Sequence, residues 1–261
     1  MNTLPACQGT PHIRVEDLTM AYGRTVIQRK LNFTVCRGEV FVIMGPSGCG
    51  KSTLLRHMVG LKEPAKGRVL FDDCDFWQAT PQQRQQIMQK CGILYQSGAL
   101  WSSMTLAENI AVPLQEYTGL NKAQIREVVA LKLALVGLAG YEDYFPSEIS
   151  GGMKKRAGLA RAMALDPEIL FFDEPSAGLD PISSRLLDDL ILELSASLGS
   201  TIVVVSHELA SIFSIAHKAI FLDPESKTML AYGSPQELLD APDNPKVRAF
   251  LKREAFTAGG K

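Results

Sequence analysis

Residues 45–52 have the composition and spacing of a phosphate-binding loop, GPSGCGKS, which fits the pattern G-x-x-x-x-G-K-[ST]. The glycines let the backbone curl so that successive N–H groups point at phosphate oxygens. Lys51 would place its charge near the β and γ phosphates, and the Ser52 hydroxyl would bind Mg²⁺. The segment therefore predicts a nucleoside triphosphate site. The residues expected around the phosphates are Gly45, Pro46, Ser47, Gly48, Cys49, Gly50, Lys51, Ser52 and Thr53.

A second motif, at 169–174, is an apolar run followed by two carboxylates, ILFFDE. Such a run is typical of a buried parallel strand, and in open α/β sheets ligands lie at the carboxyl edge of the strands. We therefore expect both acids to face the phosphates that the loop binds. Asp173 would hold Mg²⁺ through its water shell, and Glu174 would polarise the attacking water.

A third motif, Ser-Gly-Gly at 150–152, precedes a basic, alanine-rich stretch that we expect to be helical over 154–165. Serine is a good helix N-cap, and two glycines leave the first helical N–H groups uncovered, which makes a second anion site. One chain needs only one loop for one triphosphate. The second site therefore suggests closure over a nucleotide held by another copy of the chain.

This order of motifs resembles the ATP-binding cassette (ABC) family, whose signature Leu-Ser-Gly-Gly-Gln stands between the phosphate loop and the Asp-Glu strand. The resemblance extends from about residue 12 to about residue 240, although Met153 replaces the signature glutamine. It implies an α/β P-loop NTPase fold with an antiparallel β subdomain and an inserted helical subdomain at about 97–157. A short C-terminal extension would occupy 241–261. The resemblance also implies a head-to-tail homodimer that binds ATP at its interface.

Further residues match family motifs. Gln96 corresponds to the glutamine that touches Mg²⁺ and the attacking water, and His207 to the histidine that contacts the γ phosphate. Asp180 corresponds to the loop that crosses to the partner, and Tyr22 to the aromatic that stacks on adenine, with an ordinary turn tyrosine as the alternative. The resemblance thus implies catalysis by Glu174, His207 and Gln96, metal binding by Ser52, Gln96 and Asp173, and contacts across the dimer from Ser150, Gly151, Gly152 and Asp180.

A closer resemblance links segments 95–100, 109–114, 151–156 and 173–182 to the ATPases of Mla-type phospholipid transporters, which work between the two membranes of Gram-negative bacteria. It implies two copies of an integral membrane permease, a periplasmic mammalian-cell-entry lipid-binding protein and a small cytoplasmic regulator as partners. It also implies a peripheral location on the cytoplasmic face of the inner membrane. An importer or exporter of another substrate stays open as an alternative, and the direction of transport is not readable.

The elements that position these motifs follow from patterning. Short alternating runs over 12–43, broken at Gly23 and Gly38, predict antiparallel strands. Asn121 is a candidate N-cap for a helix in the inserted region, Ser234 for one near the C-terminus, and 244–252 is a candidate short helix. Four apolar residues follow Gln96: Leu100, Trp101, Met104 and Leu106. Either all four pack the helical subdomain, or Trp101 and Met104 form a groove for a permease helix.

Composition narrows the class of protein. The chain has 261 residues, of which 46% are hydrophobic, and a net charge of −1, which favours one large α/β domain and no nucleic-acid partner. No segment approaches the ~18 apolar residues of a membrane-spanning helix, so we expect a cytosolic enzyme whose membrane role comes through a partner. The five cysteines lack C-x-x-C spacing and are interpreted as reduced thiols.

Other nucleotide-dependent classes fit less well. Soluble ABC ATPases that act on DNA need long coiled coils, and those that act on ribosomes usually carry two cassettes; the chain has neither feature. Residues 121–124, NKAQ, lack the acid with which GTPases read guanine. Residues 154–156, KKR, are interpreted as a solvated basic face near the nucleotide rather than as a nucleic-acid patch.

Overall fold

The computed structural model describes residues 9–240 and 244–254. Within these ranges a six-stranded central sheet has the order β10-β9-β3-β8-β7-β6. The pairs β9-β3, β3-β8, β8-β7 and β7-β6 are parallel, and β10 runs antiparallel at the edge. These strands are β3 (Val40–Met44), β6 (Cys91–Leu94), β7 (Ile169–Asp173), β8 (Thr201–Val205), β9 (Lys218–Asp223) and β10 (Thr228–Gly233).

A second, antiparallel sheet has the order β2-β1-β4-β5 within the described residues. It consists of β1 (Pro11–Tyr22), β2 (Thr25–Cys36), β4 (Lys66–Phe71) and β5 (Cys74–Asp75). The antiparallel strands predicted over 12–43 are confirmed for β1 and β2, whereas β3 belongs to the central sheet. Helix α1 (Lys51–Met58) shares one apolar cluster with both sheets, in which Phe33 of β2 stacks on Phe41 of β3 with ring centroids 5.3 Å apart.

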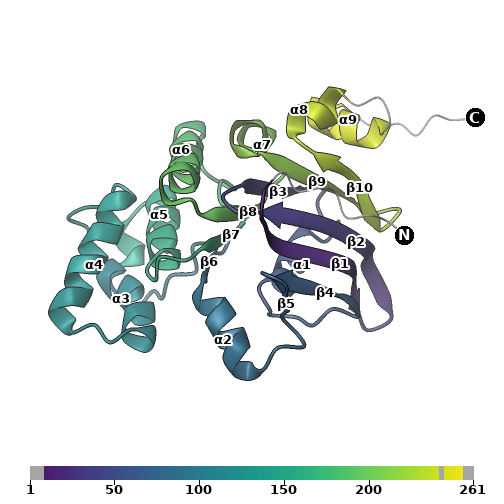
Figure 1. Cartoon of the computed structure of the whole chain (residues 1–261). Coiled ribbons are helices and arrows are strands. Elements are labelled where there is room, and N and C mark those ends of the chain that lie inside the picture. The colour runs from purple at the N-terminus through teal and green to yellow at the C-terminus, as the bar shows by residue number, and fades with distance from the viewer. Residues whose placement is uncertain (1–8, 241–243, 255–261) are drawn as a thin grey trace, which may run out of the picture.

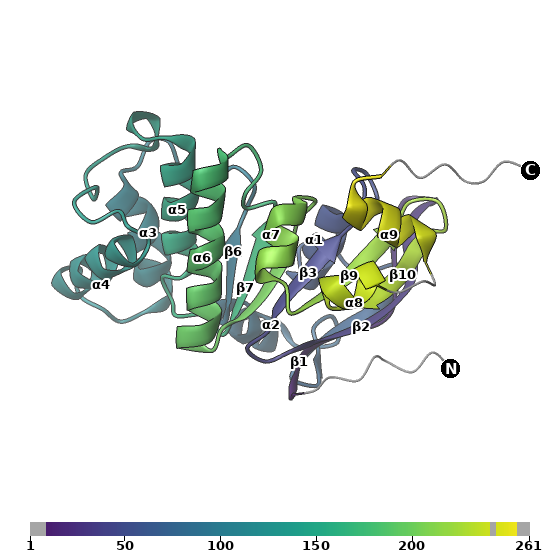
Figure 2. The same ribbon diagram turned by 90° about the horizontal axis from the view of Figure 1, so that it is seen from above.

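The opposite face of the central sheet is covered by helices that share a second apolar cluster. Figures 1 and 2 show α3 and α4 at one end of the molecule, with α5 between them and α6. The helices not yet given are α2 (Pro81–Gln89), α3 (Leu106–Tyr117), α4 (Lys122–Leu135), α5 (Gly151–Ala162), α6 (Pro181–Leu198), α7 (Leu209–Ile215), α8 (Pro235–Asp240) and α9 (Pro245–Lys252), with a 3₁₀ turn η1 at Pro146–Glu148.

Several predicted helix starts are confirmed. The Asn121 side chain accepts hydrogen bonds from the first turn of α4, and the Ser234 hydroxyl accepts one from Glu237 in α8. Helix α9 lies within the predicted 244–252 and packs on β9, with the rings of Phe221 and Phe250 5.2 Å apart. Helix α5 begins at Gly151, earlier than the predicted 154.

Two further findings concern membrane-spanning helices and the cysteines. Among the residues that the structure describes, no helix combines the length and apolarity needed to cross a bilayer. Cys49, Cys74 and Cys91 are free thiols, whereas Cys36 is disulfide-bonded. The prediction of five reduced thiols is therefore wrong at Cys36.

Candidate functional site

The phosphate loop connects the end of β3 to the first residue of α1, and its shape depends on glycine. Gly45 has φ +148°, and a Cβ there would lie 2.5 Å from the Leu222 carbonyl oxygen. Gly50 has φ +102°, and a Cβ would lie 2.7 Å from Ile27 Cγ2. Ser47 and Gly48 are exposed at the crest of the loop. The backbone between β3 and α1 can therefore approach an anion closely, as the motif predicts.

Lys51 and Ser52 connect the loop to the end of β7. The Lys51 ammonium donates hydrogen bonds to the carbonyl oxygens of Gly45 (3.0 Å) and Pro46 (3.3 Å). The Ser52 hydroxyl donates to Asp173 Oδ1 at 2.8 Å. A serine hydroxyl beside an aspartate carboxylate is a pair of hard oxygen ligands, so these two residues fit a bound Mg²⁺.

Glu174 occupies the turn directly after β7. Its φ is +51°, a left-handed conformation that costs a residue other than glycine about 1–2 kcal/mol, and its N–H donates to the Val205 carbonyl of β8. The largely buried carboxylate lies between two basic side chains. Oε1 is 3.8 Å from Lys51 Nζ, and Oε2 is 2.8 Å from His207 Nδ1. The His207 contact is close but not aligned as a hydrogen bond. A carboxylate and a cation therefore lie together at the carboxyl edge of the sheet, a geometry that suits general-base chemistry.

Tyr22 lies at the end of β1, beside α1. Its ring is 47% exposed, and hydrogen bonding to Thr53 and then to Arg56 lowers the pKa of its phenol. The Lys62 ammonium lies 2.9 Å from the ring centroid and covers one face of the ring. A base that stacked on Tyr22 would take the other face or displace Lys62.

The remaining predicted residues lie shortly after β6 and at the starts of α5 and α6. Gln96 is exposed after β6, and the Ser150 hydroxyl caps α5 by accepting from Met153 N–H at 3.2 Å. Asp180 caps α6 by accepting from the N–H groups at 182 and 183. No hydrogen bond or ion pair within residues 9–240 joins Gln96, Ser150 or Asp180 to the phosphate loop.

Gln28 supports the loop from β2 and was not predicted. The side chain is fully buried, and its amide donates to the Cys49 carbonyl (2.8 Å) and to the Asp223 carbonyl (3.0 Å). Its Oε1 is buried without a partner. Cys49 thus serves the loop through its backbone, and burial raises the pKa of its thiol. The only signal in the sequence was a polar residue at an inward position of a strand.

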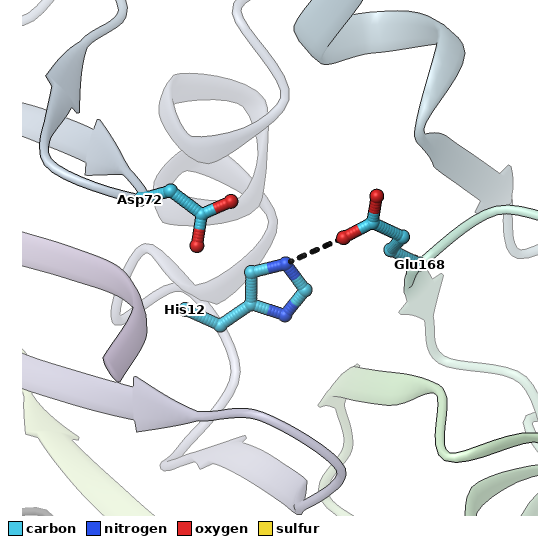
Figure 3. Close-up of side chains that lie close together, drawn as sticks. All are labelled: His12, Asp72 and Glu168. Atoms are coloured by element: carbon cyan, nitrogen blue, oxygen red, sulfur yellow. Dashed lines mark ion pairs between the residues drawn. The ribbon is translucent and has the colours of Figure 1, made fainter. Parts of the chain in front are cut away.

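A second polar cluster lies at the opposite edge of the sheet. His12, Asp72 and Glu168 bring ligand atoms within 4.8 Å of one another, and Figure 3 shows His12 facing Glu168. Arg37 pairs with both carboxylates, at 2.6 Å and 3.0 Å, and Lys90 pairs with Glu168 at 2.8 Å. Burial and the charge of Arg37 lower the pKa of His12. Because basic side chains already neutralise the acids, this cluster is an ion-pair network that joins the two sheets rather than a cation site.

The fold and the site together define a P-loop nucleotide-binding cassette. The ABC transporter family matches residues 28–177. The chain is 41% identical over 243 residues to "Intermembrane phospholipid transport system ATP-binding protein MlaF" of Haemophilus influenzae, covering 93% of this chain and 91% of that protein. The chain therefore belongs to the ABC transporter family of ATPases.

Two further similarities extend this comparison. The chain is 42% identical over 239 residues to "Probable ribonucleotide transport ATP-binding protein mkl" of Mycobacterium tuberculosis, with 92% of this chain covered. It spans 66% of the length of that relative. Among solved structures, a dimeric post-hydrolysis state of the ATP-binding cassette MJ0796 bound to ADP and Pi matches with TM-score 0.78 at 26% identity, over 85% of this chain and 98% of that one.

Proposed function

We propose that this chain is the ATP-hydrolysing, energy-coupling subunit of a membrane transporter. The observation that carries the proposal is the convergence of Lys51, Glu174 and His207 at the carboxyl edge of the central sheet. In this proposal the loop binds the phosphates, Glu174 activates the attacking water, and His207 and Gln96 contact the γ phosphate and the water. Mg²⁺, held by Ser52 and Asp173 with Gln96 nearby, would offset the phosphate charge.

The active form is proposed to be a head-to-tail homodimer. Among the described residues, Ser150 and Asp180 make no hydrogen bond or ion pair with the loop of their own chain, and Gly151 has open space around its Cβ position. Ile182 lies in the first turn of α6 beside Asp180 and is 75% exposed, which suits an interface. In the dimer, Ser150, Gly151, Gly152 and Asp180 would complete the ATP site of the other copy.

A groove beside the helical region is proposed to receive the permease. It has a volume of about 560 Å³ and is lined by α2, β6, α3 and α5. Trp101 lies in this groove, 49% exposed, with the Arg161 guanidinium 5.4 Å from its ring. An exposed tryptophan in a concave surface is a suitable anchor for an amphipathic helix. Gln96 lies in the sequence between two lining segments of the groove, 85–93 and Trp101, so the groove would move with the state of the phosphates.

Phospholipid is the proposed substrate, moved between the inner and outer membranes of a Gram-negative bacterium. The support is the similarity to the phospholipid transport protein of Haemophilus influenzae over nearly the full length of both chains. The subunit would lie on the cytoplasmic face of the inner membrane, bound to two permease copies. A periplasmic mammalian-cell-entry protein and a small cytoplasmic regulator would complete the complex. The name of the mycobacterial relative makes ribonucleotide the competing substrate.

Purification of the chain with its native membrane partners tests both the assembly and the substrate. Mass spectrometry of the complex should identify two permease copies and co-purifying phospholipid above the level in a matched membrane extract. ATP hydrolysis by the complex should rise in vesicles that contain phospholipid. A complex that instead releases ribonucleotide would show that the substrate proposal is wrong while leaving the ATPase assignment intact.

A further inference from the structure

Helix α5 carries basic side chains that bind backbone carbonyls of neighbouring loops. Arg161 donates to the carbonyls of Gly98 and Ala99, two and three residues after Gln96. Arg156 donates to the carbonyls of residues 136 and 137 at the end of α4. Lys155 binds the turn that follows β7. The interpretation of residues 154–156 as a solvated basic face is therefore wrong at Lys155, which is only 6% exposed.

The Lys155 ammonium is held by carbonyl oxygens of that turn. It donates to Pro175 O at 2.6 Å, to Ala177 O, and more weakly to Glu174 O at 3.5 Å. An ammonium has three N–H donors, so these acceptors satisfy it. No carboxylate lies within ion-pair distance of it in the described part of the chain. A buried lysine that serves only backbone carbonyls fixes the shape of a turn rather than neutralising a charge.

The turn at 174–177 connects residues that are proposed to act at the two ATP sites of the dimer. It begins at Glu174, whose carboxylate faces Lys51 and His207 in the same chain. It ends shortly before Asp180, which is proposed to reach the other copy. Lys155 also lies five residues after the cap Ser150, about 7.5 Å along the helix. The start of α5 further contacts the start of α6, because a Cβ at Gly152 would lie 3.4 Å from Ser183 Oγ.

We infer that Lys155 is a positioning residue that couples the two ATP sites of the dimer. In the proposed homodimer, on which this inference rests, the N-terminus of α5 binds the nucleotide at one site while Glu174 of the same chain serves the other site. A rigid helix joined to the Glu174 turn through Lys155 transmits closure at the first site to the position of the base at the second. Binding at one site therefore promotes hydrolysis at the other.

Substitution of Lys155 tests this coupling in the full-length chain. Lys155→Met keeps the length and removes the donors, whereas Lys155→Gln retains an amide with two N–H donors. Lys155→Met should bind ATP within about twofold of wild type, lose about ten- to a hundredfold in kcat, and show a Hill coefficient for ATP hydrolysis of about 1. Lys155→Gln should recover part of the kcat and of the cooperativity.

Lys154→Met is the matched control, since the Lys154 ammonium makes no hydrogen bond or ion pair within the described residues. It should keep the wild-type Hill coefficient. A lower kcat in Lys155→Met with unchanged cooperativity would overturn the inference, as would non-cooperative hydrolysis by the wild type. If Lys155→Met does not fold, Lys155→Gln decides the role of the residue. Wild-type kinetics in Lys155→Gln would mean that Lys155 serves the fold alone. Unfolding of Lys155→Gln would lead to the same conclusion. A wild type that binds no ATP would refute the proposed function instead.

Discussion

At the residue scale, Lys51 and Glu174 lie 3.8 Å apart but are expected to perform different tasks. Glu174→Gln removes the base and keeps the loop, so it should bind ATP, promote dimer formation, and lose at least about a hundredfold in turnover. Lys51→Ala removes the charge that holds the phosphates and should lose both binding and turnover. Titration with a fluorescent ATP analogue beside an ATPase assay separates the two effects; equal ATP affinity in both variants would show that the roles are misassigned.

Gln28 is expected to hold the phosphate loop in its binding conformation. Gln28→Leu preserves much of the volume but leaves the carbonyls of Cys49 and Asp223 without their donor, at a cost of about 1–3 kcal/mol of unfolding free energy for each buried group. The KM for ATP should rise more than kcat falls. Gln78→Leu, at an exposed position, is the control. Reduced stability with an unchanged KM would assign Gln28 to the fold only.

Motif residues could be predicted one by one because their chemistry depends on fixed local spacing. Gln28 and Lys155 could not, since their partners are distant in sequence: Gln28 binds a carbonyl 195 residues away, and Lys155 one 20 residues away. A lysine in a basic run is usually solvated, and only the fold shows that its ammonium meets backbone carbonyls instead. Sequence patterns therefore do not predict buried polar side chains that hydrogen-bond to backbone groups far away in the sequence.

At the scale of elements, local capping explains which boundaries were predicted. Helix α4 starts where Asn121 predicts, because both halves of its capping box lie within one turn. Helix α5 starts at Gly151 despite two glycines of low helix propensity, because the Ser150 hydroxyl binds Met153 N–H. Of the four apolar residues at 100–106, Leu106 is buried in the core and Leu100 packs against it. Trp101 lines the groove, whereas Met104, which was expected beside it, is not among the lining residues.

Trp101→Ala tests the proposed permease groove. Since the indole is half exposed and Arg161 lies over its ring, its removal should leave the chain folded and able to bind ATP. Association with the permease should weaken by about 2 kcal/mol or more, as for other interface anchors. Phe213→Ala, at an exposed aromatic outside the groove, should assemble normally. Unfolding of the Trp101 variant, or normal assembly with full support of lipid transport, would exclude the groove assignment.

The ion-pair network around Glu168, which joins the two sheets, should make the free energy of unfolding fall at acid pH. Hydrogen bonds from Lys90 and then Arg37 lower the pKa of Glu168 from 4.5 to about 2. Its contribution to the unfolding free energy is therefore complete above pH 4.5 and disappears as the pH falls toward about 2. Because these groups are partly exposed, we expect about 1 kcal/mol or less.

Thermal unfolding of Glu168→Gln between pH 7 and pH 2 measures that contribution. The variant should be less stable than wild type at neutral pH, and the two curves should converge at the acid end. Glu127→Gln changes an exposed carboxylate with no ion pair among the described residues, so it should follow the wild type throughout. A constant difference between Glu168→Gln and wild type across this pH range would mean that lost packing, rather than charge, causes the effect.

At the scale of the whole molecule, the resemblance of the motifs to the ABC family predicted the fold class and the inserted helical subdomain. Alternation along the chain predicted the antiparallel strands. How α1 packs between two sheets was not predictable, since that cluster joins Phe33, Leu54 and Val203 from separate elements. The proposed assembly of two copies rests on Ser150 and Asp180, which cap helices of their own chain but make no hydrogen bond or ion pair with its phosphate loop within the described residues. An experiment on the dimer tests it.

Mixed dimers test whether Ser150 serves the nucleotide of the other copy. If each site combines the loop of one chain with Ser150 of its partner, then Ser150→Arg in one subunit and Lys51→Ala in the other disable the same site and leave one site intact. Both changes in one subunit disable both sites. Differently tagged subunits, purified as heterodimers, should therefore retain measurable ATP hydrolysis in the first arrangement and lose it by at least about tenfold in the second. The reverse pattern, with activity retained only when both changes lie in one subunit, would show that Ser150 acts on the nucleotide of its own chain. Equal activity in the two arrangements would show that Ser150 does not complete either site. Either result would mean that the head-to-tail assembly has to be abandoned.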